Sequence, residues 1–159
     1  MSVLWSAFGG GFIGTVVMTT LLRGAAELGY TRMDLPFLLG TAVTDNRRMA
    51  KVIGYLIHFV LGVSFALLYG AFFAAIDRSS WWLGAAIGVL QALFTSTVLV
   101  NVLLPVVHPR MGTPETGASE IALIEPPGFL MLNYGRNTFL INVIAHIAYG
   151  AIVGWAIRV

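Results

Sequence analysis

The stretch 53–76, IGYLIHFVLGVSFALLYGAFFAAI, decides the fold of this chain because it contains no charged side chain. A helix needs about 20 apolar residues to cross the hydrocarbon core of a bilayer, so this stretch is long enough to span one. A single histidine, His58, interrupts it. Small residues recur at every fourth position, at Gly62, Ala66, Gly70 and Ala74. The stretch therefore predicts a transmembrane helix with one face of small residues and one strongly polar position.

Three further apolar runs of similar length accompany this one, and we predict spans over about 3–29, 50–77, 80–107 and 137–158. Of the 159 residues, 58% are hydrophobic and 10% are charged, whereas soluble domains carry about 25% charged residues. The sequence therefore predicts an all-α polytopic membrane protein with four transmembrane helices in a compact bundle, a single domain over 1–159. The absence of Cys excludes disulfides and thiolate metal sites.

The positions of Lys and Arg predict how the bundle is oriented. Cytoplasmic loops of membrane proteins are enriched in these residues, and only Arg78 and Arg158 lie on the side of the termini. Seven lie on the side of the first and third loops: Arg23, Arg32, Arg47, Arg48, Lys51, Arg110 and Arg136. We therefore expect both termini outside and the first and third loops in the cytoplasm, in the lipid bilayer of a bacterial cytoplasmic (inner) membrane.

Every span carries small residues four positions apart, a pattern that lets helices approach closely in lipid. The ladders are Ser6, Gly10 and Gly14; Gly62, Ala66, Gly70 and Ala74; Gly84, Gly88 and Ala92; and Gly150 and Gly154. All of them lie in the half of the membrane near the Trp residues, so we expect tight packing there. The ladders also suit a homodimer interface or a place in a larger membrane complex, and the sequence leaves these alternatives open.

Strongly polar side chains occupy the other half of the membrane. They are His58, His108, His146, Asn101 and Asn142. Polar groups in hydrocarbon face the bundle interior or a water-filled cavity. We therefore expect these residues to line a ligand pocket that is open to the cytoplasm. The alternative is that each of them makes an ordinary interhelical hydrogen bond.

Short sequence matches relate the two halves of the chain. The matches are His58-Phe-Val-Leu-Gly62 with His146-Ile-Ala-Tyr-Gly150, and Gly10-x-x-x-Gly14 with Gly84-x-x-x-Gly88. Two hairpins repeated in parallel would be related by an axis along the membrane normal, which would place His58 and His146 at similar depth. Matches this short also arise by chance.

The first and third loops carry most of the remaining charged residues. In the first loop, Asp34 is expected to cap a short apolar helix that ends at Gly40. In the third loop, Thr113 is expected to open a helix that continues to about Ile124. We expect the two loops to fold back, together with His108, as a lid over the pocket. The lid residues are Asp34, Arg110, Glu120, Glu125, Tyr134 and Arg136; the alternative is that they pair with one another and with lipid headgroups.

Four motifs carry a family resemblance. They are His108-Pro-Arg-Met-Gly-Thr113, Glu125-Pro-Pro-Gly-Phe-Leu130, Asn133-Tyr-Gly-Arg136 and Gly54-Tyr-x-x-His58-Phe-x-x-Gly62. Through them the chain resembles, from about Asp34 to Gly154, an uncharacterised family of small four-helix bacterial integral membrane proteins of the actinobacterial type. The resemblance implies a four-helix fold and a role for the third loop. It implies no activity, ligand or partner.

The pattern favours a non-enzymatic membrane protein whose pocket binds a small ligand, a lipid headgroup or an ion, as a transporter-like or accessory subunit without a predicted cofactor. The alternative is a protein that binds haem b or a transition metal through His58 and His146, with or without His108. An enzyme acting on a lipid has less support, because the sequence has no nucleophile elbow or phosphate loop. Nucleic-acid binding has none, because no basic stripe with interleaved aromatic residues is present.

Overall fold

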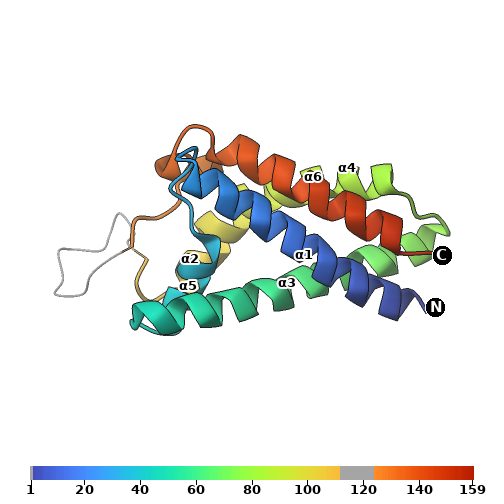
Figure 1. Cartoon of the computed structure of the whole chain (residues 1–159), viewed down its shortest axis with the longest axis horizontal. Coiled ribbons are helices and arrows are strands. Elements are labelled where there is room, and N and C mark those ends of the chain that lie inside the picture. The colour runs from blue at the N-terminus through green and yellow to red at the C-terminus, as the bar shows by residue number, and fades with distance from the viewer. Residues whose placement is uncertain (1, 112–123) are drawn as a thin grey trace.

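The computed structural model describes residues 2–111 and 124–159, and this part of the chain is helical. Figure 1 shows both termini at one end of an elongated bundle, which we call the terminus end, and the segments 28–46, 108–111 and 124–137 at the other, which we call the loop end. In chain order the helices are α1 (Val3–Glu27), α2 (Leu35–Thr41), α3 (Arg47–Ile76), α4 (Trp81–Phe94), the π-helix η1 (Thr95–Leu103), α5 (Leu104–Val107), the 3₁₀-helix η2 (Phe129–Tyr134) and α6 (Thr138–Ala156).

Four helices are long and apolar enough to cross a membrane. They are α1, α3, α6 and the third span Trp81–Val107, which joins α4, η1 and α5. The predicted all-α fold with four spans is confirmed, and the bounds of the spans differ from the prediction by a few residues. The largest difference is at α3, which begins earlier because the side chain of Asn46 accepts hydrogen bonds from the backbone N–H groups of Arg48 and Met49, both at 3.1 Å.

The spans pack in the order α3, α1, α6, α4, so that α1 and α6 are the central pair. The short helix α2 packs on the loop-end half of α3. Two glycines allow this contact: a Cβ atom on Gly40 would clash with the backbone of Ala50, and one on Gly54 would clash with the carbonyl of Pro36. The expected short helix after Asp34 is therefore present, and Asp34 caps it by accepting a hydrogen bond from the backbone N–H of Phe37 at 3.1 Å.

Glycines bring the backbones of α4 and α6 into direct contact near the terminus end. A Cβ atom added at Gly84 would lie 2.9 Å from the Cα of Gly154 and would clash with the carbonyl oxygen of Gly150. One turn further, a Cβ atom on Gly88 would clash with the carbonyl oxygen of His146. Because apolar side chains gain little by leaving lipid, such backbone approach provides the packing that holds membrane helices together.

The third span is not one regular helix. Between α4 and α5, η1 makes wider π turns, so that the N–H of Leu104 bonds to the carbonyl of Leu99, five residues before it. Pro105 lacks the N–H that an α-helix would pair with Asn101, and its ring clashes with a carbonyl in that geometry. Packing against α6 is provided by α4 and ends with it. Beyond that point the span runs across the bundle toward α2 (Figure 1).

The packing follows the suggested hairpin repeat only in part. Within each hairpin the two spans are in contact, α1 with α3 and α4 with α6. An exact twofold axis would also make α3 pack on the third span as α6 packs on α1. Instead, α1 and α6 pack closely, whereas α3 and the third span do not. The asymmetry leaves a space in the loop-end half of the bundle.

The expected helix from Thr113 to Ile124 lies almost entirely outside the described residues. The chain on either side of it is held together, because the N–H of Ile124 donates to the carbonyl of Arg110 at 2.8 Å. Met111 and Ile124, the described residues on either side of this segment, therefore lie next to each other beside α2.

The glycine contact between α4 and α6 can be tested by adding a single methyl group to one of its glycines. We expect Gly150→Ala to destabilise the folded monomer by about 1–3 kcal/mol, because the added methyl group meets the Gly84 backbone, which cannot move aside independently of its helix. The matched control is Gly9→Ala, since a Cβ atom at Gly9 has open space around it. Thermal unfolding in mild detergent measures both. A Gly150→Ala variant that unfolds like the wild type and only loses dimers would contradict the packing within the bundle.

Candidate ligand-binding site

A cavity of about 370 Å³ fills the space between α3, the third span and α6 in the loop-end half. Most of its lining is aliphatic or aromatic, with Leu61 and Phe65 from α3 and Leu99 and Val100 from η1 among the walls. Five polar side chains also line it: His58, Gln91, Thr95, Asn142 and His146. The cavity is thus an apolar space with a polar inner wall.

Side chains border the cavity toward both ends of the bundle. Toward the terminus end, the hydroxyl of Tyr69 on α3 donates to Oε1 of Gln91 on α4 at 2.7 Å, which joins the two helices. At the loop end, Leu35, Leu39 and Met131 form part of the lining. Met131 is held there by a backbone with φ of 59°, a left-handed conformation that is costly for a residue other than glycine.

The border of the cavity reaches the outer surface beside the third span. Val106 and Val107, which line it, are 81% and 70% exposed and are the last residues of the third span. The cavity therefore reaches the surface between apolar side chains at the loop end of this span. The sequence predicted a pocket open to the cytoplasm, and this stays a prediction.

His146 is buried in α6, with one ring nitrogen already engaged. Its Nδ1 lies 2.8 Å from the backbone carbonyl oxygen of Asn142, one turn earlier in the same helix. A carbonyl can only accept, so Nδ1 carries the hydrogen, and Nε2 of the neutral ring is an acceptor. His146 lines the cavity, so Nε2 is the nitrogen with which its ring can accept a hydrogen bond from a bound molecule.

Asn142 is almost completely buried at the interface of α6 and the third span. Its Nδ2 lies 3.4 Å from the carbonyl oxygen of Ala92 and 3.4 Å from Oγ1 of Thr95. The hydroxyl of Thr95 itself donates to the Ala92 carbonyl at 3.1 Å, so its oxygen is free to accept. These contacts fix the amide with its nitrogen toward the third span. Its Oδ1 is then an acceptor with no partner among the described residues.

His58 faces the same cavity from α3. The residue is 4% exposed, and its Nε2 is buried without a hydrogen-bond partner in the described part of the chain. A buried polar atom left without a partner costs about 1–3 kcal/mol. His58 and Asn142 therefore line one cavity from two different helices, and each has one buried polar atom without a partner among the described residues.

A second, smaller hollow of about 200 Å³ lies on the other side of His58, between α1, the start of α2 and α3. We call it the crevice, and its polar lining consists of Thr19, Arg23, Glu27, Asp34, Lys51, Tyr55 and His58. Two ion pairs lie along it, Arg23 with Glu27 at 2.8 Å and Lys51 with Asp34 at 3.7 Å. Among the predicted lid residues that the structure describes, Asp34 thus lines the same hollow as His58, a histidine of the predicted pocket.

Two residues expected in the pocket lie elsewhere. His108 is buried between the third loop and α2, where its Nε2 lies 3.0 Å from the carbonyl oxygen of Leu38 and its Nδ1 accepts from the N–H of Arg110 at 3.2 Å. Asn101 bonds within the third span, its Nδ2 donating to the carbonyl of Ser96 at 2.9 Å. Neither residue lines the cavity. Both side chains form hydrogen bonds with backbone groups of the third span, α2 or the third loop.

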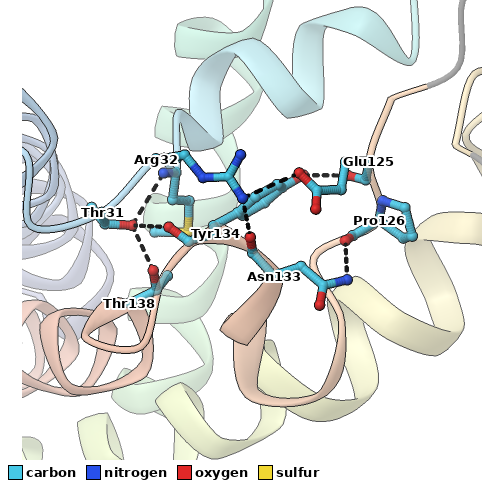
Figure 2. A network of polar contacts seen from close by, with 8 residues as sticks. Thr31, Arg32, Glu125, Pro126, Asn133, Tyr134 and Thr138 are labelled. Atoms are coloured by element: carbon cyan, nitrogen blue, oxygen red, sulfur yellow. Dashed lines mark hydrogen bonds and ion pairs between the residues drawn. The ribbon is translucent and has the colours of Figure 1, made fainter.

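The first and third loops are joined by a network of hydrogen bonds (Figure 2). The N–H of Arg32 donates to the carbonyl of Tyr134 at 2.8 Å, and the hydroxyls of Thr31 and Thr138 lie 2.6 Å apart. The guanidinium of Arg32 contacts the carbonyl of Asn133 and lies 3.4 Å from Oε2 of Glu125. The loops are therefore held to each other across the loop end.

Tyr134 contributes to this network through its backbone carbonyl and through its phenol hydroxyl. Burial, reinforced by the nearby Glu125 carboxylate, raises the pKa of the Tyr134 phenol to about 12. Its hydroxyl is therefore protonated at neutral pH and donates to the backbone carbonyl of Glu125 at 2.7 Å. The guanidinium of Arg110 likewise donates to the carbonyl of Thr41 at 2.6 Å. Arg136 is exposed, and Glu120 lies outside the described residues.

The predicted lid residues are thus used mainly to hold the loops together. The side chains of Arg110 and Tyr134 bond to backbone carbonyls, and that of Glu125 pairs with Arg32. None of the three lines the cavity. The segments that they hold supply Leu35, Leu39 and Met131 to its loop end. The sequence missed Gln91 and Thr95, although their spacing places them on the same helical face as the glycines that contact α6.

No family model, curated protein or solved structure matches this chain. The argument about the site therefore depends on its geometry. Within residues 2–111 and 124–159, no three His, Asp or Glu side chains are grouped as ligands for a metal ion.

The position of His108 predicts a structural role that can be separated from the cavity. We expect His108→Ala to cost about 1–3 kcal/mol of stability, because it removes a buried contact to α2 and leaves the N–H of Arg110 without its partner. Hydrogen exchange should increase in α2 and around residues 108–111. Arg136→Ala, at an exposed position, is the control. Unchanged exchange in α2 together with loss of a molecule bound in the cavity would contradict this assignment.

Proposed function

We propose that this chain is a membrane protein that binds a lipid-soluble molecule with a hydrogen-bonding end group in the cavity between α3, the third span and α6. One observation carries the proposal: His58 and Asn142 both line a mostly apolar cavity, and each has a buried polar atom, Nε2 and Oδ1, without a partner among the described residues. The volume of about 370 Å³ lies within the range of about 300–1,000 Å³ usual for ligand pockets.

The polar wall indicates the kind of end group that fits. Oδ1 of Asn142 accepts, and Nε2 of the neutral His146 ring accepts as well, so the ligand has to supply a hydrogen. His58 can donate or accept according to its tautomer. A hydroxyl group combines one donor with acceptor lone pairs and so satisfies Asn142 and His58 together. The apolar body of such a molecule would enter from the bilayer, beside Val106 and Val107.

The proposal is tested by filling the cavity. In Leu99→Trp the larger side chain would occupy part of the space that Leu99 now borders. We expect protein released from its native membrane in polymer nanodiscs to retain one lipid-soluble species in roughly stoichiometric amount, and Leu99→Trp to retain at least tenfold less. Solvent extraction and mass spectrometry measure the retained species.

The matched control is Val102→Trp, three residues further along the same π-helix. Val102 is 56% exposed and does not line the cavity, so this variant should retain the species like the wild type. Equal retention by wild type, Leu99→Trp and Val102→Trp would show that the lipid is merely the surrounding bilayer and would overturn the proposal.

A second candidate function, the binding of haem b or a transition metal, is favoured by one feature of the site. His58 and His146 line the same cavity, and Nδ1 of His146 donates to a backbone carbonyl, as histidines that bind metals through Nε2 commonly do. Absorption spectra of the oxidised and reduced protein, with elemental analysis, test it. A b-type haem band or stoichiometric metal that His58→Ala and His146→Ala both remove would favour this function; a colourless, metal-free protein would exclude it.

We further propose that the protein lies in a bacterial cytoplasmic membrane with both termini outside. The seven basic residues near the loop end support this orientation, and the two termini share one end of the bundle. Because the chain has no Cys, a single Ser2→Cys variant can be labelled alone. We expect an impermeant thiol reagent to label it in intact cells and to leave Arg136→Cys unlabelled; the reverse would contradict the orientation.

A further inference from the structure

His58 separates two hollows of opposite character. On one side is the mostly apolar cavity, which reaches the exposed side chains of Val106 and Val107. On the other is the crevice, which carries Arg23 and Glu27 on α1, and Lys51 and Tyr55 on α3. The ring of His58 lines both. The polar wall of the cavity is therefore one side chain away from a charged surface at the loop end.

The charged groups around the crevice are hydrated. The side chains of Arg23 and Glu27 are 46% and 64% exposed, and those of Lys51 and Asp34 are 44% and 34% exposed. Ionised groups keep water around them, because removing it costs more than an ion pair returns. The hollow between these pairs, at about 200 Å³, is large enough for several water molecules and offers them polar partners. Away from its polar inner wall, in contrast, the cavity is lined by aliphatic and aromatic side chains, and apolar space stays dry.

We propose that the crevice is an aqueous inlet, through which water from the loop end reaches His58 and, past it, the polar end of the cavity. The inference rests on the proposed function, and it refines the class of ligand. The bound molecule enters from lipid with its apolar body, and its end group meets water at His58. An end group that both donates and accepts hydrogen bonds, such as a hydroxyl, fits this position. An ester end has no donor, and a hydrocarbon end has neither donor nor acceptor.

The inlet can be mapped with single cysteines, because the chain has none of its own. Tyr55→Cys stands on the wall of the crevice, and Thr19→Cys and His58→Cys stand deeper along it. The probe is a positively charged, membrane-impermeant methanethiosulfonate added to membrane vesicles with the loop end facing the reagent. We expect all three cysteines to react, since the attacking group is the cysteine thiolate, which forms where water is present and displaces methanesulfinate from the reagent as the mixed disulfide forms.

Leu61→Cys is the matched control, because Leu61 is on α3 one turn from His58 and lines the cavity but not the crevice. We expect it to react at least tenfold more slowly than His58→Cys. Thr19→Cys is the second test of the inner end, since it changes the side chain little and should fold if His58→Cys does not.

The outcomes separate this inference from the proposed function. If Tyr55→Cys reacts while Thr19→Cys and His58→Cys are as slow as Leu61→Cys, the crevice is shallow and the inlet is refuted, although lipid retention by the cavity is unaffected. If Leu61→Cys reacts as fast as His58→Cys, water fills the cavity as well, and the division into a wet and a dry side is wrong. Reaction along the crevice that stops at Leu61 supports the inlet.

Discussion

The structure depends on the direct backbone contact between α4 and α6. In lipid no hydrophobic force draws helices together, so the energy has to come from close packing. Gly84 and Gly88 on one helix, with Gly150 and Gly154 on the other, remove the side chains that would keep the two backbones apart. Because α6 also packs on α1, and α1 on α3, this contact ties the third span to the remainder of the bundle.

The same contact explains why a cavity forms where it does. The third span follows α6 only as far as α4 extends, and its π-helical continuation crosses the bundle instead. On the other side, α2 packs on α3 through Gly40 and Gly54, and its leucines close the loop end of the resulting space. A tightly packed half and an open half are therefore two results of one arrangement. In the open half, His58 and Asn142 each keep one buried polar atom without a hydrogen-bond partner among the described residues.

The sequence predicted the four spans, the glycine contacts and the cap at Asp34, because these depend on local composition and spacing. It also placed His58, His146 and Asn142 in one half of the membrane, and the structure brings them to one cavity. The structure departs from the prediction where distant segments meet. The cavity exists because α3 and the third span do not pack closely on each other, and no local pattern indicates this. His108 looked like a pocket residue because of its type, whereas its partners belong to α2, about 70 residues away in the chain.

The most direct measurement is an experimental structure of the protein in lipid nanodiscs, at a resolution that places hydrogen-bonding groups. The account predicts a bound, elongated molecule between α3 and the third span, with its polar end within hydrogen-bond distance of Nε2 of His58 and Oδ1 of Asn142. A structure in which α3 closes onto the third span, so that protein side chains fill the space and satisfy both atoms, would contradict the account.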